Sequence, residues 1–228
     1  METRVIEMLR DIMVLKCQEE KQCHRDNTKY HSLFTVLGMI SLVFLSITFI
    51  VYISVPKLFN LQGKILISNI TSIFLVTLYL LIVYNITPTR SVFCIVLGYF
   101  GYFVSISMFG WMTVICLDLS WTFCRYSIPR TGSDSSKLLS YSTLAWGVAT
   151  LLTGLVFCLD LTLPDRSEWK PNIGMSSCFI EDVHHKRMVF FHIPVLVLMF
   201  INLILFFLTI YNLHQHSKQT REVRLSRR

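Results

Sequence analysis

The sequence stretch that decides the fold is residues 92–123, VFCIVLGYFGYFVSISMFGWMTVICLDLSWTF, which contains a single charged side chain, Asp118. A run of about 18 or more mostly apolar residues can cross roughly 30 Å of hydrocarbon as a helix. Helices and closed barrels satisfy their backbone hydrogen bonds there, and barrel strands alternate in hydrophobicity over about ten residues. The stretch therefore predicts a membrane-spanning helix, which is longer than the bilayer needs and so tilts or extends beyond the hydrocarbon.

Apolar runs of the same kind lie on both sides of this stretch. The expected spans are about 33–55, 64–84, 92–123, 138–159 and 188–213. Of the 228 residues, 53% are hydrophobic and only 15% are charged, whereas about a quarter are charged in a typical soluble domain. We therefore expect an all-α, multi-span transmembrane helix bundle, with a short extracellular segment over 1–31, a membrane core over 32–213 and a basic cytoplasmic tail over 214–228.

The distribution of Lys and Arg favours an extracellular N-terminus and a cytoplasmic C-terminus. In this orientation the inner loops and the tail carry ten basic residues, and the outer loops carry five. Short cytoplasmic loops are normally the ones richer in Lys and Arg. The N-terminal segment adds six basic residues on the outside, which weakens the count. We expect a multi-pass protein of the plasma membrane.

Two of the seven cysteines support the same orientation. Cys94 lies at the start of the third span, and Cys178 lies in the long acidic loop between the fourth and fifth spans. With the N-terminus outside, both face the oxidising compartment, where disulfides persist. Cys17 and Cys23 would also be outside, and the sequence leaves open whether they pair with each other or with cysteines of another chain.

The sequence contains no pattern that predicts an enzyme, a cofactor site or a nucleic-acid-binding protein. The formal charge is +7, but the basic residues lie in loops and in the tail beside the spans, where they attract anionic lipid. We find no Gly-rich phosphate loop and no metal-ligand spacing of Cys and His. His184, His185 and His192 lie near the outer surface, and we expect them to be solvated rather than bound to a metal.

Several motifs, taken in order along the chain, resemble one receptor family. Residues 56–64 read PKLFNLQGK, residues 109–123 read FGWMTVICLDLSWTF, and residues 169–174 read WKPNIG. The fifth span carries Pro194, Asn202, Phe206 and Thr209. Over roughly residues 30–220, this set resembles the Methuselah-like receptors, an insect branch of the secretin-like (class B) G-protein-coupled receptors.

The resemblance implies a seven-helix receptor that binds an extracellular ligand of unknown identity and a heterotrimeric G protein. It also implies a disulfide between Cys94 and Cys178, because many seven-helix receptors join these two places. The chain departs from the family in having five spans and only about thirty residues before the first span, where the family has a large ectodomain. We therefore expect an incomplete receptor fragment. The alternative is a non-signalling five-span interaction protein that pairs with a full-length receptor.

Five residues at the expected inner face are candidates for a coupling surface or a conformational lock: Asn60, Gly63, Lys64, Asp118 and Arg125. The first three form either a coupling surface or a tight turn whose lysine reaches the headgroups. Asp118 lies 24 residues after Cys94, or about 36 Å along a helix. It therefore either forms a lock with Arg125 or Lys64, or is solvated at the cytoplasmic boundary. The basic tail binds a G protein or anionic membrane lipids.

Polar and small residues inside the spans have structural interpretations. Asn69 and Asn202 face either the bundle, where interhelical hydrogen bonds average about 0.6 kcal/mol, or a polar ligand cavity. Pro194 predicts a kink whose freed carbonyl is satisfied by a neighbouring group. Gly147 and Gly154 share one face of the fourth span, which predicts close packing against another helix.

Overall fold

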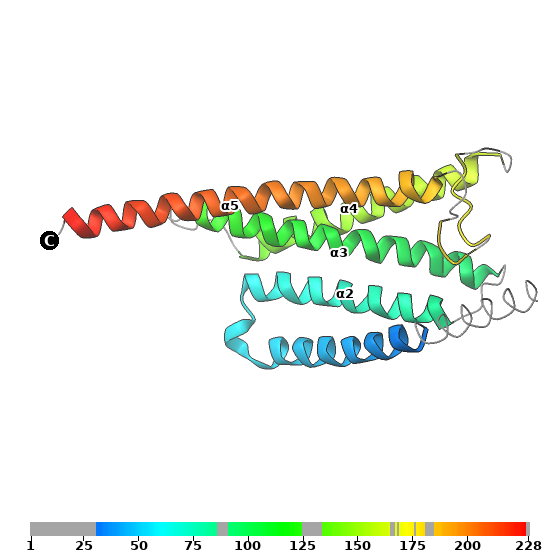
Figure 1. The fold of residues 1–228 in the computed structure, drawn as a ribbon, viewed down its shortest axis with the longest axis horizontal. Helices are drawn as coiled ribbons and strands as arrows, with labels where there is room; N and C mark the ends of the chain where they lie inside the picture. Colours follow the sequence, from blue (N-terminus) through cyan, green and yellow to red (C-terminus); the bar gives the residue numbers. More distant parts are fainter. Residues whose placement is uncertain are drawn as a thin grey trace, which may run out of the picture. The chain divides into compact units, whose positions relative to one another are not determined.

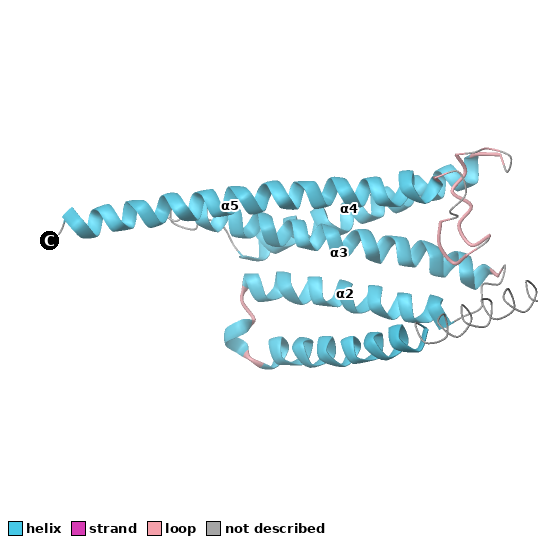
Figure 2. Cartoon of the chain, in the orientation of Figure 1, coloured by secondary structure: helices cyan, strands magenta, loops and turns pink. Residues whose placement is uncertain are grey.

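The computed structural model describes residues 31–85, 91–124, 134–164, 167, 169–175, 177–180 and 185–226. The helices are His31–Ser54, the 3-10 turn η1 (Pro56–Leu58), α2 (Leu61–Asn85), α3 (Val92–Cys124), α4 (Asp134–Thr162), the π-helical turn η2 (Met188–His192) and α5 (Ile193–Ser226). No strand occurs among the described residues (Figure 2). Five of the helices are long and apolar enough to cross a membrane, which confirms the predicted helical membrane bundle.

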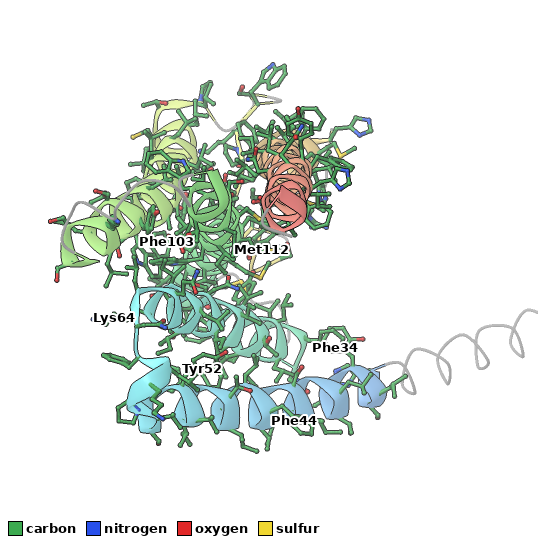
Figure 3. The ribbon with its side chains drawn as sticks, turned by 90° about the vertical axis from the view of Figure 1, so that its left-hand side faces the viewer. Phe34, Phe44, Tyr52, Lys64, Phe103 and Met112 are labelled. Atoms are coloured by element: carbon green, nitrogen blue, oxygen red, sulfur yellow. A yellow bond between two sulfur atoms is a disulfide. The ribbon has the colours of Figure 1, made fainter. Side chains whose placement is uncertain are left out.

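The chain divides into two compact units, Met1–Phe44 and Leu45–Arg228. The described part of the first unit is helical throughout. The second unit contains α2 to α5, and α3 contacts all three of the other long helices in it (Figure 1). In the view along the helices, α3 lies between α2, α4 and α5 (Figure 3). The second unit is therefore organised around α3.

Local sequence sets the start of α2. Proline removes a backbone N–H donor and cannot continue a helix, and Pro56 lies two residues after Ser54, where the first helix ends. Asn60 then caps α2, because its Oδ1 accepts a hydrogen bond of 2.8 Å from the Gly63 N–H. Helix α2 consequently begins at Leu61, before the span that hydrophobicity alone predicts.

Helices α2 and α3 approach each other closely at Gly101. The ring of Tyr79 occupies the space that a Cβ on residue 101 would need. Tyr79 is buried, and its hydroxyl donates a hydrogen bond of 2.9 Å to the carbonyl oxygen of Cys178. The absence of a side chain at Gly101 therefore lets the two helices pack together.

The loop between α4 and α5 is fastened to the first turn of α3. Cys94 and Cys178 are bonded, with Cα atoms 4.7 Å apart, so the disulfide implied by the family resemblance is present. The loop side chains Ile173 and Ile180 are buried in a hydrophobic cluster that also contains Tyr102 of α3. The loop is thus held both covalently and by burial of apolar side chains.

Asp160, near the end of α4, adds hydrogen bonds to this arrangement. Its Oδ2 accepts a bond of 2.8 Å from the Tyr99 hydroxyl, and its Oδ1 accepts one of 2.9 Å from the Asn172 N–H. The backbone turns sharply here, because Asn172 and Gly174 have φ angles of 52° and 81°, in the left-handed region that these residue types tolerate. One carboxylate therefore joins α3, α4 and the loop.

Pro194 shapes the start of α5. Because proline has no N–H, it cannot donate to the carbonyl four residues earlier, that of Phe190. The Tyr102 hydroxyl of α3 donates to the Phe190 oxygen instead, at 2.8 Å. The Ile193 N–H bonds to the Met188 oxygen, five residues back, as in a π-helix. The prediction that a neighbour satisfies the carbonyl freed by this proline is confirmed.

The expected packing at Gly147 and Gly154 is not found among the residues that the structure describes. A Cβ added at either position would have no heavy atom within 4 Å among the described residues. Helix α4 instead packs against α3 through another face, which contains Ala145 and Ala149. The sequence pattern showed that the two glycines share a face, but it could not show which face of α4 is covered.

Gly101→Ala is expected to lower the thermal stability of the protein. The new methyl group would overlap the ring of Tyr79, and overpacking of this kind typically costs about 1–3 kcal/mol. Gly147→Ala is the matched control, because its Cβ meets nothing within 4 Å. Size-exclusion chromatography after heating in detergent would give an apparent Tm for each variant. Equal Tm values for the two variants would contradict the close contact at Gly101.

Tyr102→Phe is also expected to lower stability. The substitution removes the donor to the Phe190 carbonyl oxygen, which proline leaves unsatisfied, and a buried unpaired acceptor costs about 1–3 kcal/mol. Tyr211→Phe serves as the control, because Tyr211 is exposed and its hydroxyl contacts only Gln215 on the surface. The same heating assay applies, and an unchanged Tm for Tyr102→Phe would show that the carbonyl does not need this donor.

Candidate coupling site at the end of α3 opposite the disulfide

The N-terminal cap and first turn of α2 contain three of the predicted site residues. Asn60 Oδ1 accepts from the Gly63 N–H, and the Asn60 carbonyl oxygen accepts from the Lys64 N–H at 3.0 Å. A Cβ on Gly63 would overlap the Leu58 carbonyl oxygen. The Lys64 ammonium lies 5.0 Å from the centroid of the Phe59 ring, as a cation–π contact. These contacts account for Asn60 and Gly63 as parts of a tight, capped turn.

Asp118 is buried near the other end of α3 from the disulfide. Only 6% of its surface is exposed, and its Oδ1 accepts a hydrogen bond of 3.2 Å from the Tyr141 hydroxyl of α4. The solvated alternative for Asp118 is therefore inconsistent with the structure. Of the two partners considered from the sequence, Lys64 lies against Phe59, and Arg125 lies outside the described residues.

Ser120 joins the same part of α3 to α5. Its hydroxyl lies 2.6 Å from the Thr209 hydroxyl and donates to the Leu205 carbonyl oxygen at 3.2 Å. Together with the Asp118–Tyr141 bond, this contact fastens α3 to both α4 and α5 within two residues of sequence. We call these four side chains the inner polar cluster: Asp118, Ser120, Tyr141 and Thr209.

Aromatic packing supports the inner polar cluster from the middle of the bundle. Trp146 of α4 stacks on Phe103 at 5.6 Å between ring centroids and meets Trp111 edge-on at 6.0 Å. At Gly110, an added Cβ would lie 3.1 Å from the carbonyl oxygen of Ala145. These contacts hold α3 and α4 close together on the side of the Asp118–Tyr141 bond that faces the disulfide.

Sequence reasoning identified Asp118 but missed the other three members of the inner polar cluster. Most Ser and Thr hydroxyls in the described helices donate to the carbonyl four residues earlier, as those of Thr71, Ser105 and Thr113 do. The hydroxyls of such residues are hydrogen-bonded within their own helix, so their presence in the sequence does not predict a contact with another helix. Ser120 looks the same in sequence, so only the packing of α3 against α5 reveals its partners.

The arrangement can hold α3, α4 and α5 together through side-chain hydrogen bonds. Within the residues that the structure describes, no group of three His, Cys, Asp or Glu side chains could hold a metal ion. The members of the inner polar cluster are polar partners of one another, contributed by three different helices. A displacement of α4 or α5 relative to α3 would break one of these bonds, so the site can respond to helix movement.

Comparison with known proteins identifies the family. Residues 27–228 match the family described as 7 transmembrane receptor (Secretin family). G-protein coupled receptor Mth of Drosophila yakuba is 34% identical over 178 residues, which are 77% of this chain and 34% of that protein. Probable G-protein coupled receptor Mth-like 4 of Drosophila melanogaster is 31% identical over 194 residues, 81% of this chain and 36% of that protein.

The chain spans about a third of the length of the curated relatives that it matches. The matched region nevertheless contains all five membrane-spanning helices and both cysteines of the disulfide. The family resemblance seen in the sequence motifs is therefore confirmed. The chain belongs to the secretin family of seven-transmembrane receptors, in its Methuselah-like branch.

Proposed function

We propose that this chain forms part of the membrane core of a G-protein-coupled receptor that acts in cell-surface signalling. Its relatives are described as G-protein coupled receptors, and it has five of the seven spans of their family. The exposed surface of α4 and α5 is strongly apolar, as expected for helices that contact membrane lipids. The proposed location is the plasma membrane.

The disulfide supports an orientation with the N-terminus outside. Disulfides persist in the oxidising extracellular compartment and are rare in the cytosol, so the end of α3 that carries Cys94 should lie outside. Counting spans from there supports an extracellular N-terminus and a cytoplasmic C-terminus for the chain. Helix α5 continues to Ser226, so much of the predicted tail extends this helix toward the cytoplasm.

The observation that carries the proposed function is that α3 is tied at both of its ends. Outside, Cys94 is bonded to the loop; inside, Asp118 and Ser120 bond to α4 and α5. An extracellular ligand that binds one arrangement of the helices more tightly would shift the equilibrium toward it. The inner polar cluster would then rearrange, and a heterotrimeric G protein would recognise the changed inner face.

A second candidate function is supported by the side of α3 that the other described helices leave open. Met112 and Leu119 are 42% and 38% exposed although α3 is the central helix, and Met112 points away from α4 (Figure 3). This open side suits further membrane-spanning helices. If a separate full-length receptor supplied them, the five-span chain would act as a non-signalling interaction protein.

The proposed orientation predicts that an epitope tag placed after Arg228 is stained only in permeabilised cells. The reason is the odd number of spans combined with an extracellular disulfide. A tag before Met1 is the matched control and should be stained in intact cells. Staining of the C-terminal tag in intact cells would contradict the orientation.

The 228-residue chain, expressed alone, is expected to produce no second messenger above background. Extension by the sixth and seventh helices of a relative should restore output. In the extended form, Tyr141→Phe should raise basal output, because it removes a bond that holds α3 to α4. The rise should be at most about tenfold, since such a bond contributes about 1 kcal/mol.

Each output must be divided by the amount of protein at the cell surface, measured through an extracellular tag. Tyr211→Phe provides the control, because Tyr211 is exposed and its hydroxyl accepts a hydrogen bond from Gln215, which is not a member of the inner polar cluster. Strong output from the 228-residue form would contradict the need for further helices. An unchanged basal output in the extended Tyr141→Phe variant would contradict the proposal that Asp118 locks α3 to α4.

A further inference from the structure

Two buried polar atoms in the middle of the bundle have no hydrogen-bond partner among the described residues. They are Nε1 of Trp111 on α3 and Oδ1 of Asn69 on α2. The two side chains are only 1% and 8% exposed. An indole N–H is a donor and an amide oxygen is an acceptor, so the two atoms are chemically complementary. Buried polar atoms are normally satisfied, and an exception needs an explanation.

The helix register brings these two atoms to the same level. Leu61 and Ile65 of α2 pack against Trp111, and Asn69 follows Ile65 by four residues on the same face, about one turn further along. Helices α2 and α3 are antiparallel, and Tyr79 meets Gly101. Ten residues earlier on α2 is Asn69, and ten residues later on α3 is Trp111, so the two lie opposite each other.

The surroundings exclude lipid and additional helices as the missing partner. Trp146 of α4 meets the Trp111 ring edge-on at 6.0 Å, and Ala145 packs beside it. Trp111 is therefore enclosed by α2, α3 and α4. Helices added on the open side of α3, near Met112, would not reach its indole nitrogen.

We propose that a buried water molecule binds between α2 and α3, accepting a hydrogen bond from Trp111 Nε1 and donating one to Asn69 Oδ1. Trp111 Nε1 and Asn69 Oδ1 are not bonded to each other or to another described residue, and a water can bridge a donor and an acceptor that do not bond directly. Buried waters typically satisfy such otherwise unpaired polar groups. The water would link the two helices in the middle of the membrane, where other hydrogen bonds between helices are few. This inference does not depend on the proposed signalling function.

A double-mutant cycle on the full chain tests the water site, with apparent Tm in detergent as the measurement. Asn69→Leu and Trp111→Phe are each expected to lower Tm by about 2–4 °C. The double variant should lose less than the sum of the two single losses, because either change already breaks the bridge. A rise in Tm for Asn69→Leu would show a dry, unpaired amide, and additive losses would show that the two groups are independent. Either result overturns the proposal.

Two further variants sharpen the test. Asn69→Gln carries the amide one methylene further, so it should replace the water, bond to the indole N–H directly and keep the parental Tm. A loss as large as that of Asn69→Leu would point to direct bonding in the parent and contradict the water. Ser107→Ala is the control, because Ser107 is buried and its hydroxyl donates to Phe103 within α3. Its effect should simply add to that of Asn69→Leu.

Discussion

The structure of the second unit depends on the packing of α3 against three helices at once. Without a hydrophobic driving force between helices in lipid, association relies on close contact and interhelical hydrogen bonds. Helix α3 supplies both, because Gly101 admits the Tyr79 ring and Gly110 admits the backbone of α4. Its hydroxyl and carboxylate groups then form hydrogen bonds with α4, η2 and α5. The other three helices, α2, α4 and α5, make most of their helix contacts with α3. Without α3, few contacts would join them to one another.

Polar contacts differ between the two ends of α3. At the disulfide end, Tyr79, Tyr99 and Tyr102 each extend a hydroxyl from an aromatic body to a loop or helix acceptor. Each tyrosine buries its apolar ring and donates one hydrogen bond, so this end of α3 is held both by packing and by hydrogen bonds. At the opposite end, the contacts are between the short hydroxyls of Ser120 and Thr209 and between the Tyr141 hydroxyl and the Asp118 carboxylate. The disulfide end is also joined covalently to the loop, so we expect helix movement to be easier at the opposite end.

The sequence was sufficient to predict the helices, because length and hydrophobicity determine what can cross a bilayer. The disulfide needed the family resemblance, since spacing alone cannot pair cysteines. The partner of Asp118 was not predictable. Charge suggested Lys64, which lies against Phe59, or Arg125, which lies outside the described residues. The partner that the structure shows is Tyr141, and the sequence around a tyrosine indicates neither the helix it faces nor its acceptor. The covered face of α4 was also missed, since lipid-facing and helix-facing apolar residues look alike.

The separation of 84 residues between Cys94 and Cys178 has a consequence during biosynthesis. At about 5–20 residues per second, roughly 4–17 seconds of translation separate the two thiols. In the proposed orientation, Cys178 reaches the oxidising lumen of the secretory pathway only after α4 has been inserted in the correct direction. If α4 were inserted backwards, Cys178 would stay on the cytosolic side, the membrane would separate it from Cys94, and the two thiols could not bond to each other. Formation of this bond therefore records that the fourth helix has been inserted correctly.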